Sequence, residues 1–275
     1  DVTGDMTTMT IIPALFDKID NGGSQLWDLL SADPDRYIPE SVRHGINEDL
    51  PPEISVGLKE PDSRELWSEK ADVLIGLPGE TWWEAIDRHK HYEETWKALS
   101  GEEVQDVSMA LALNLDLRLL AQDFLASLSD LDSLNHAHDQ LKSLSVLDPT
   151  CGSGAFLFAA LELLVDLYTV VFERAEELIS SSEDLPYFLA EVDQHPNMRY
   201  YILRLVLLNN LHGVDLMEEA VEIARLRLFL TLAAQLESKE HIEPFPDLDF
   251  NIKVGNLLIG VASPQDARDR LGTDL

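Results

Sequence analysis

The stretch that decides the fold reads Val146-Leu147-Asp148-Pro149-Thr150-Cys151-Gly152-Ser153-Gly154-Ala155-Phe156-Leu157. A short apolar run meets a glycine turn and a longer apolar run follows, which predicts a strand, a loop and a helix. Glycines let the loop backbone turn tightly and approach a ligand, and the N-terminus of the helix offers unpaired N–H groups. The pattern predicts a ligand-binding loop; a plain glycine turn before a core helix is the alternative.

Two well-known phosphate loops fit these residues poorly. No Gly-Lys-Ser/Thr follows, and Phe156 or Leu157 stands where the dinucleotide fingerprint has its third glycine. No basic residue stands in the loop to meet a phosphate. Instead Asp148 ends the strand, and a carboxylate at that place suits a ligand with a positive amino group.

A second strand and helix are predicted over residues 211–228. The apolar run before Asp215 reads as a buried strand, and Leu216, Ala220, Ile223, Ala224 and Leu228 recur at helical spacing. A carboxylate at a strand end can accept both ribose hydroxyls of a nucleoside. An N-cap for the helix is the alternative role of Asp215.

A third segment, residues 250–260, has apolar runs on both sides of Gly255-Asn256. It fits a third strand whose end presents the Asn256 amide to a ligand. An ordinary Gly-Asn turn is the alternative.

Together the three segments resemble the amino-type DNA methyltransferases that modify adenine N6. The sequence Asp-Pro-x-Cys-Gly-Ser-Gly-x-Phe-Leu resembles the first motif of that family, where the loop holds S-adenosyl-L-methionine. The resemblance implies that Asp148 faces the methionine end, Asp215 binds the ribose, and Leu216 or Met217 flanks the adenine, which Asn256 also contacts. The implied cofactor site consists of Asp148, Pro149, Thr150, Cys151, Gly152, Ser153, Gly154, Phe156, Asp215, Leu216, Met217 and Asn256.

The likeness is strongest to the large methyltransferases of restriction-modification and phage-defence systems. It runs from about residue 114 to residue 260 and includes residues 209–215, 225–228 and 242–251. The implied fold class is α/β: a partial Rossmann-like S-adenosylmethionine-dependent methyltransferase sheet, preceded by a mostly helical N-terminal region.

The catalytic loop of that family is not found in these residues. An Asn/Asp/Ser-Pro-Pro-Tyr/Phe loop grips the flipped adenine there, whereas the chain's one Pro-Pro pair reads Leu50-Pro51-Pro52-Glu53 and is interpreted as a loop. We therefore expect no catalytic residue in this chain, an inactive fragment, and a catalytic loop and DNA-reading domain beyond Leu275. The complete enzyme would transfer a methyl group directly to adenine N6.

Two other functions fit the same motifs. A related amino-methyltransferase that acts on RNA or on a protein glutamine would share these motifs. A degenerate, non-catalytic domain that serves assembly of a defence complex would also share them, and loss of cofactor binding would favour it.

Composition limits the possible partners. The 20 basic and 51 acidic residues give a net charge of −31, so DNA phosphates repel the chain and we expect it to bind DNA poorly alone. One cysteine, Cys151, excludes an internal disulfide and a multi-cysteine zinc site; we interpret it as a packing residue rather than a nucleophile. We expect a cytoplasmic protein without a metal, and a buried helix rather than a membrane span over residues 155–172, because Glu162 and Asp166 interrupt that apolar run.

Two domains are predicted. Residues 1–143 form a mostly helical region, with helical spacing at 82–99 and 107–128, a loop-rich stretch around its prolines, and tryptophans that pack in the core. Residues 144–275 form the N-terminal part of the methyltransferase domain. An acidic helical insertion at about 173–199 delays the second strand, and we expect it to be a surface feature. The pairs His89/His91 and His136/His138 are two apart, so each pair points to different helical faces and is not expected to bind a metal.

Overall fold

A computed structural model describes residues 2–19, 25–179, 186–236, 248 and 251–257. The chain divides into two compact units, one of residues 1–19 and 125–275 and one of residues 20–124. The division falls inside helix α8 (Leu117–Ser127). The predicted domain boundary after residue 143 stays a prediction, but the structure groups the first helix and residues 131–143 with the unit that carries the sheet.

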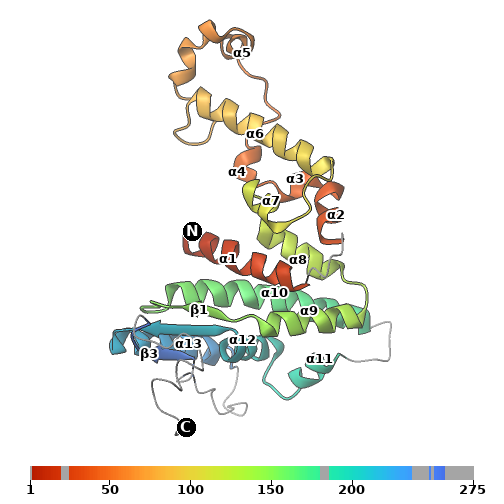
Figure 1. Ribbon diagram of the computed structural model, residues 1–275, viewed down its shortest axis with the longest axis vertical. Coiled ribbons are helices and arrows are strands. Elements are labelled where there is room, and N and C mark those ends of the chain that lie inside the picture. Colours follow the sequence, from red (N-terminus) through yellow and green to blue (C-terminus); the bar gives the residue numbers. More distant parts are fainter. Residues whose placement is uncertain (1, 20–24, 180–185, 237–247, 249–250, 258–275) are drawn as a thin grey trace, which may run out of the picture. The chain divides into compact units, whose positions relative to one another are not determined.

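The first unit, residues 1–19 and 125–275, carries a parallel three-stranded sheet with helices around it (Figure 1). Its strands are β1 (Val146–Asp148), β2 (Leu211–Asp215) and β3 (Ile252–Val254). Its helices are α1 (Val2–Ile19), α9 (Leu131–Ser143), α10 (Ala155–Ile179), α11 (Tyr187–Val192), α12 (Met198–Asn209) and α13 (Glu218–Ala233). This confirms the α/β class; the Rossmann-like methyltransferase character of the sheet stays a prediction.

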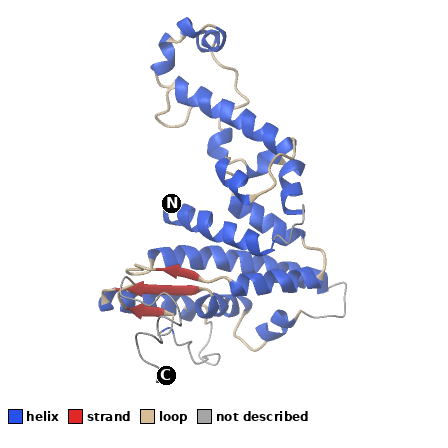
Figure 2. Cartoon of the chain, viewed as in Figure 1, coloured by secondary structure: helices blue, strands red, loops and turns tan. Residues whose placement is uncertain are grey.

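The strand order is β1-β2-β3, and both pairs are parallel (Figure 2). Leu147 pairs with His212 and Val214 pairs with Lys253. Asn210, which is fully buried, donates its amide to the carbonyls of Leu141 and Leu144, each at 2.8 Å. A buried amide would be costly without such partners, so this residue fixes the entry of β1 beside β2.

Helix α10 forms the centre of this unit. It packs against α1, α9 and α12 and reaches β1 and β2. Length and composition alone would allow this helix to cross a membrane. Its buried residues lie along its whole length and include Leu157, Leu164, Tyr168 and Phe172, as a helix at the centre of a core requires.

The predicted insertion at residues 173–199 is only partly a surface feature. Its first residues extend α10 to Ile179, and α11 inserts Phe188, which is fully buried. The Phe188 ring stacks on His138 with centroids 4.5 Å apart, and His138 Nδ1 lies 2.8 Å from the Tyr187 hydroxyl. The expectation of a purely surface segment was therefore wrong, because an aromatic cluster anchors α11.

The second unit, residues 20–124, consists of helices joined by turns and loops in its described part, with one isolated antiparallel bridge between Lys70 and Thr81. It contains α2 (Gln25–Ala32), α3 (Pro34–Tyr37), α4 (Glu40–Arg43), α5 (Pro52–Lys59), α6 (Trp82–Ser100), α7 (Val107–Ala112), most of α8, and the short 3₁₀ helices η1 (Pro61–Ser63) and η2 (Glu65–Ser68). The helical spacing of residues 82–99 is confirmed. The spacing at 107–128 gives two helices, since Asn114 has a positive φ of 53° between them.

Two details of this unit differ from the sequence predictions. Pro34, Pro52 and Pro61 open short helices rather than loops, because a proline has a helical φ and needs no N–H partner in the first turn. Trp83 and Trp96 are 44% and 42% exposed, while the other three tryptophans are buried. Core packing therefore explains only some of the tryptophans.

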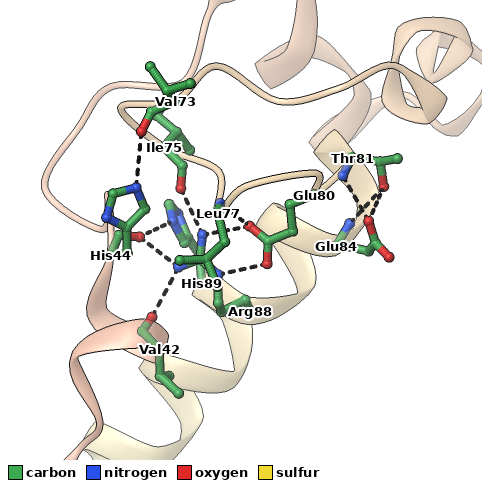
Figure 3. Close-up of polar contacts among 10 residues, drawn as sticks. All are labelled: Val42, His44, Val73, Ile75, Leu77, Glu80, Thr81, Glu84, Arg88 and His89. Atoms are coloured by element: carbon green, nitrogen blue, oxygen red, sulfur yellow. Dashed lines mark hydrogen bonds and ion pairs between the residues drawn. The ribbon is translucent and has the colours of Figure 1, made fainter.

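Arg88 of α6 holds the loop before that helix in place (Figure 3). Its guanidinium donates to both oxygens of Glu80 at 3.0 Å and to the carbonyls of Val42, His44 and Ile75. Burial raises the pKa of Glu80, but the hydrogen bonds from Arg88 and from the Leu77 N–H outweigh it and lower that pKa overall. The ionised pair thus ties residues 75–80 to α4 and α6.

Candidate cofactor-binding site

The predicted site residues meet at one edge of the sheet. Asp148 ends β1, Asp215 ends β2, and Asn256 stands two residues after the end of β3. Because the strands are parallel, their carboxyl ends lie at the same edge. The Gly255 N–H donates to the Asp215 carbonyl at 2.8 Å, so Asn256 directly follows a residue bonded to Asp215.

The glycine loop lies between β1 and α10 and is bonded to the end of β2. The Cys151 N–H donates to the Val214 carbonyl at 3.0 Å, and the Gly154 N–H donates to the Cys151 carbonyl at 2.8 Å. Gly152 and Gly154 have φ values of +50° and +90°, which residues with a Cβ rarely adopt. These two positions therefore require glycine for the turn itself.

The two glycines face different surroundings. A Cβ built on Gly152 would have nothing within 4 Å, whereas a Cβ on Gly154 would lie 3.4 Å from the Cβ of Ala224 in α13. Gly152 therefore borders open space beside the loop, and Gly154 borders the protein interior.

Asp215 is bound to the loop and to the start of α13. Its Oδ2 accepts the Gly152 N–H at 2.8 Å, and its Oδ1 accepts the Met217 N–H at 2.9 Å. These two N–H groups, that of Met217 first, hold the pKa of Asp215 below its usual range. Met217 is itself the N-cap of α13, so Asp215 is not the N-cap. Each oxygen retains a further acceptor position, as a ribose with two hydroxyls would need.

Asp148 has one oxygen that accepts a hydrogen bond and one buried oxygen without a partner in the described part of the chain. Its Oδ1 accepts the Thr150 N–H at 3.1 Å. Its Oδ2 is buried and has no hydrogen-bond partner among the residues that the structure describes. A buried carboxylate oxygen without a donor is costly, so this atom indicates a place for a cationic or N–H-bearing group.

Arg227 of α13 belongs to the segment 225–228 that carries the resemblance, but its contact with the glycine loop was not predicted from the sequence. Its Nη1 donates to the Ser153 carbonyl at 2.8 Å, and its guanidinium carbon lies 4.2 Å from the centre of the Phe158 ring. It therefore clamps the loop to α13. The signal available in the sequence was two arginines, Arg225 and Arg227, in an apolar stretch, which does not identify a contact with a loop 74 residues away.

Cys151 behaves as a packing residue. It is 5% exposed, and a Cβ on Gly213 would approach its Sγ to 3.0 Å. Burial, followed by the nearby charges of Asp148 and Asp215, raises the pKa of the thiol. A buried neutral thiol is a poor nucleophile.

Large apolar side chains near this edge are exposed to solvent. Phe156, Leu216 and Met217 are 41%, 69% and 61% exposed. Asn256 is also exposed. The resemblance assigns Leu216, Met217 and Asn256 to contacts with the adenine of the cofactor, and it includes Phe156 in the cofactor site. Residues 242–247, 249–250 and 258–260, which the prediction also used, lie outside the described residues.

Comparison with known proteins finds matches for one part of the chain. Residues 125–247 match the family model of the MmeI DNA-methyltransferase domain. A protein of Methanocaldococcus jannaschii named "Putative type II restriction enzyme and methyltransferase" is 36% identical over 126 residues, which cover 44% of this chain and 9% of that protein. The chain thus spans a small part of the length of this relative. No solved structure matches the chain significantly. Residues 125–247, which include β1 and β2, are therefore similar to the methyltransferase domain of a restriction-modification enzyme.

Proposed function

We propose that this chain is the S-adenosylmethionine-binding part of a DNA adenine-N6 methyltransferase from a restriction-modification or phage-defence system. The observation that carries the proposal is that Asp148 and Asp215 end two adjacent parallel strands at the same edge of the sheet, with the open side of Gly152 beside them. The similarity of residues 125–247 to a DNA-methyltransferase domain supports it independently.

The proposed roles follow from the chemistry of each group. Asp215, held ionised by two N–H groups, would accept the ribose hydroxyls. Leu216 and Met217 would offer apolar surface to the adenine, and the Asn256 amide would bond to its edge. Asp148 would accept the amino group at the methionine end through its unpartnered oxygen. When bound, S-adenosylmethionine would supply an electrophilic methyl group.

The target base must be gripped by other residues. Leu50-Pro51-Pro52-Glu53 lies at the start of α5, with Pro51 as N-cap and Pro52 as the first helical residue, and it belongs to the unit without the sheet. Neither a polar residue before the pair nor an aromatic residue after it is present. We therefore propose that DNA binding and base recognition use residues outside this chain, which at a net charge of −31 repels phosphates.

Covalent methylation chemistry through a thiolate is not part of this proposal. Such a mechanism needs a reactive cysteine, and the pKa of the single one here is raised by burial. Direct transfer to an amino group needs no protein nucleophile, which fits a loop that offers only hydrogen bonds and acceptor oxygens.

The absence of the target-base loop from these 275 residues also favours a second candidate. The domain could serve only assembly in a defence complex, with a glycine loop that no longer binds cofactor. A methyltransferase that acts on RNA or protein would share the cofactor site, and its substrate would have to be tested separately.

Cofactor binding by matched variants tests the proposal. Asp215→Asn keeps the size of the side chain but removes the charge, and we expect it to weaken S-adenosylmethionine binding by about ten-fold or more. Glu218→Gln removes an exposed charge three residues further on and should leave binding unchanged. Equal affinities of Asp215→Asn and Glu218→Gln would contradict the assigned site. The chain alone is expected not to methylate adenine-containing DNA, as a radiolabel transfer assay would show.

A further inference from the structure

Arg227 of α13 holds one peptide in the middle of the glycine loop. Its Nη1 donates to the Ser153 carbonyl at 2.8 Å. The N–H of the same peptide, that of Gly154, donates to the Cys151 carbonyl at 2.8 Å. The Ser153–Gly154 peptide is thus bonded at its oxygen and at its N–H, and of these two bonds only the one from Arg227 comes from outside the loop.

The loop needs such a contact because its glycines do not fix its conformation. Gly152 and Gly154 flank Ser153 and have φ values of +50° and +90°. Glycine adopts positive and negative φ about equally well, so a peptide between two glycines can rotate to another orientation at little steric cost. The side chains that contact the loop therefore have to select the observed conformation.

The ring of Phe158 supports the guanidinium of Arg227. The guanidinium carbon lies 4.2 Å from the ring centre. The same ring lies against Gly154, since a Cβ built there would be 3.6 Å from two ring carbons. Arg227 therefore contacts the loop at Ser153 and the first turn of α10 at Phe158, and a planar guanidinium can make both contacts at once.

The conformation of the loop determines how Asp215 is held. The Gly152 N–H, one residue before Ser153, donates to Asp215 Oδ2 at 2.8 Å. The Met217 N–H, directly before α13, donates to the other oxygen at 2.9 Å. Helix α13 is thus bonded at its start to the carboxylate and, through Arg227, to the loop that orients the same carboxylate. A loop that rotated away would withdraw one of these two N–H groups.

A second arginine of α13 makes a different kind of contact. The Arg225 Nε donates to the Ile252 carbonyl at 2.9 Å, and Arg225 is partly buried, so it holds β3 beside α13. Arg227 is exposed, and a single exposed hydrogen bond contributes little to folding. The conformation of the loop should therefore depend on Arg227 more than the stability of the fold does.

We propose that Arg227 is a positioning residue of the cofactor site, which affects binding of S-adenosylmethionine through the loop rather than by contact. The inference rests on the proposed function and extends it, because it assigns the binding-competent form of the loop to one side chain of α13. With Arg227 in place the loop is ordered before the ligand arrives, so binding does not have to order it. Without Arg227 part of the affinity is lost although Asp148, Asp215 and both glycines are intact.

Removal of the guanidinium and its replacement in solution test this role. Calorimetry of the whole 275-residue chain with S-adenosylhomocysteine compares the wild type, Arg227→Ala and Arg199→Ala. Arg227→Ala should bind about ten-fold more weakly. Arg199→Ala removes an exposed arginine of α12 that is not bonded to the glycine loop in the described part of the chain, and its affinity should stay within about two-fold.

Two further readouts separate positioning from general stability. Millimolar methylguanidinium should restore part of the affinity of Arg227→Ala and leave the wild type unchanged, with sodium chloride at equal ionic strength as the reference. In the free chain, hydrogen exchange of the amides in residues 151–154 should be faster in Arg227→Ala than in the wild type and in Arg199→Ala. A residue that only stabilised the fold would change exchange throughout the unit and would not be replaced by a small cation.

Arg227→Lys carries the test if Arg227→Ala does not fold. Lysine keeps the charge but cannot donate to Ser153 and cover Phe158 with one planar group, so its affinity should lie below that of the wild type. Equal affinities of the wild type and the folded Arg227 variants, or an equal loss in Arg199→Ala, would overturn the inference and leave the proposed function intact. An affinity loss without rescue and without faster exchange in the loop would also overturn it. If the folded wild type does not bind S-adenosylhomocysteine, the proposed function fails and this inference fails with it.

Discussion

Replacing Gly152 with alanine is expected to weaken S-adenosylmethionine binding more than replacing Gly154, although both positions have a positive φ. Alanine at φ +50° costs about 1–2 kcal/mol, and at φ +90° about 1–3 kcal/mol, of folding free energy. In a chain of this size each kcal/mol corresponds to roughly 2–4 °C in Tm. Both variants should therefore unfold at somewhat lower temperature.

The effect on affinity should separate them. The new methyl of Gly152→Ala enters the open space beside the loop, where nothing lies within 4 Å, and would meet the ligand. Overpacking of this kind costs about 1–3 kcal/mol, or about 5- to 150-fold in Kd. The methyl of Gly154→Ala points toward Ala224 instead, so its affinity should change less. Calorimetric titration of both variants checks this, and a larger affinity loss for Gly154→Ala would refute the reasoning.

Three further predictions concern stability. Burial lowers the pKa of His138 to about 4, compared with about 6.5 in the unfolded chain. The free energy of unfolding should therefore be full above pH 6.5 and fall by about 3 kcal/mol between pH 6.5 and pH 4. Urea titrations should show a smaller fall for His138→Phe. Phe188→Ala should cost about 3–5 kcal/mol if α11 is anchored, and a loss below about 1 kcal/mol would show that it is not. Arg88→Met leaves the Glu80 carboxylate without its partner and should lower the free energy of unfolding by about 3 kcal/mol. Lys90→Met removes one partner of an exposed pair and should lower it by about 0.5 kcal/mol or less. Similar urea midpoints for the two variants would contradict the role of the Arg88 network.

The strands and the loop could be predicted because their signals are local. A short apolar run before Asp148 and Gly152 determines a strand and a turn without knowledge of the rest of the chain, and the structure has both. The likeness of residues 125–247 to a methyltransferase domain is equally a property of consecutive residues.

The rest depends on contacts between distant segments. The sequence left Asp215 as either an N-cap or a ligand residue. The structure excludes the N-cap role, because Met217 holds that position and the Asp215 oxygens accept the N–H groups of Gly152 and Met217, while the ligand role stays a prediction. Arg227 binds a loop far away in the sequence, and the burial of Phe188 depends on His138. Amphipathic patterns predict that an element exists, but tertiary packing decides its partners.

Helix starts at prolines show a different limit. Pro34 and Pro52 suggested loops, yet a proline is compatible with the first turn of a helix. Whether a proline breaks or begins a helix depends on the residues after it. Helices as short as these contain too few residues for the helical spacing of apolar residues to be recognised in the sequence.

The measurement that tests the central claim most directly is calorimetric titration of this chain with S-adenosylmethionine, and in the same series with NAD and ATP. The arrangement of Asp148, the glycine loop and Asp215 predicts saturable binding of S-adenosylmethionine and none of the other two, since the loop lacks a basic group for phosphates. Saturable binding of NAD or ATP, or no binding of S-adenosylmethionine by the folded chain, would contradict it.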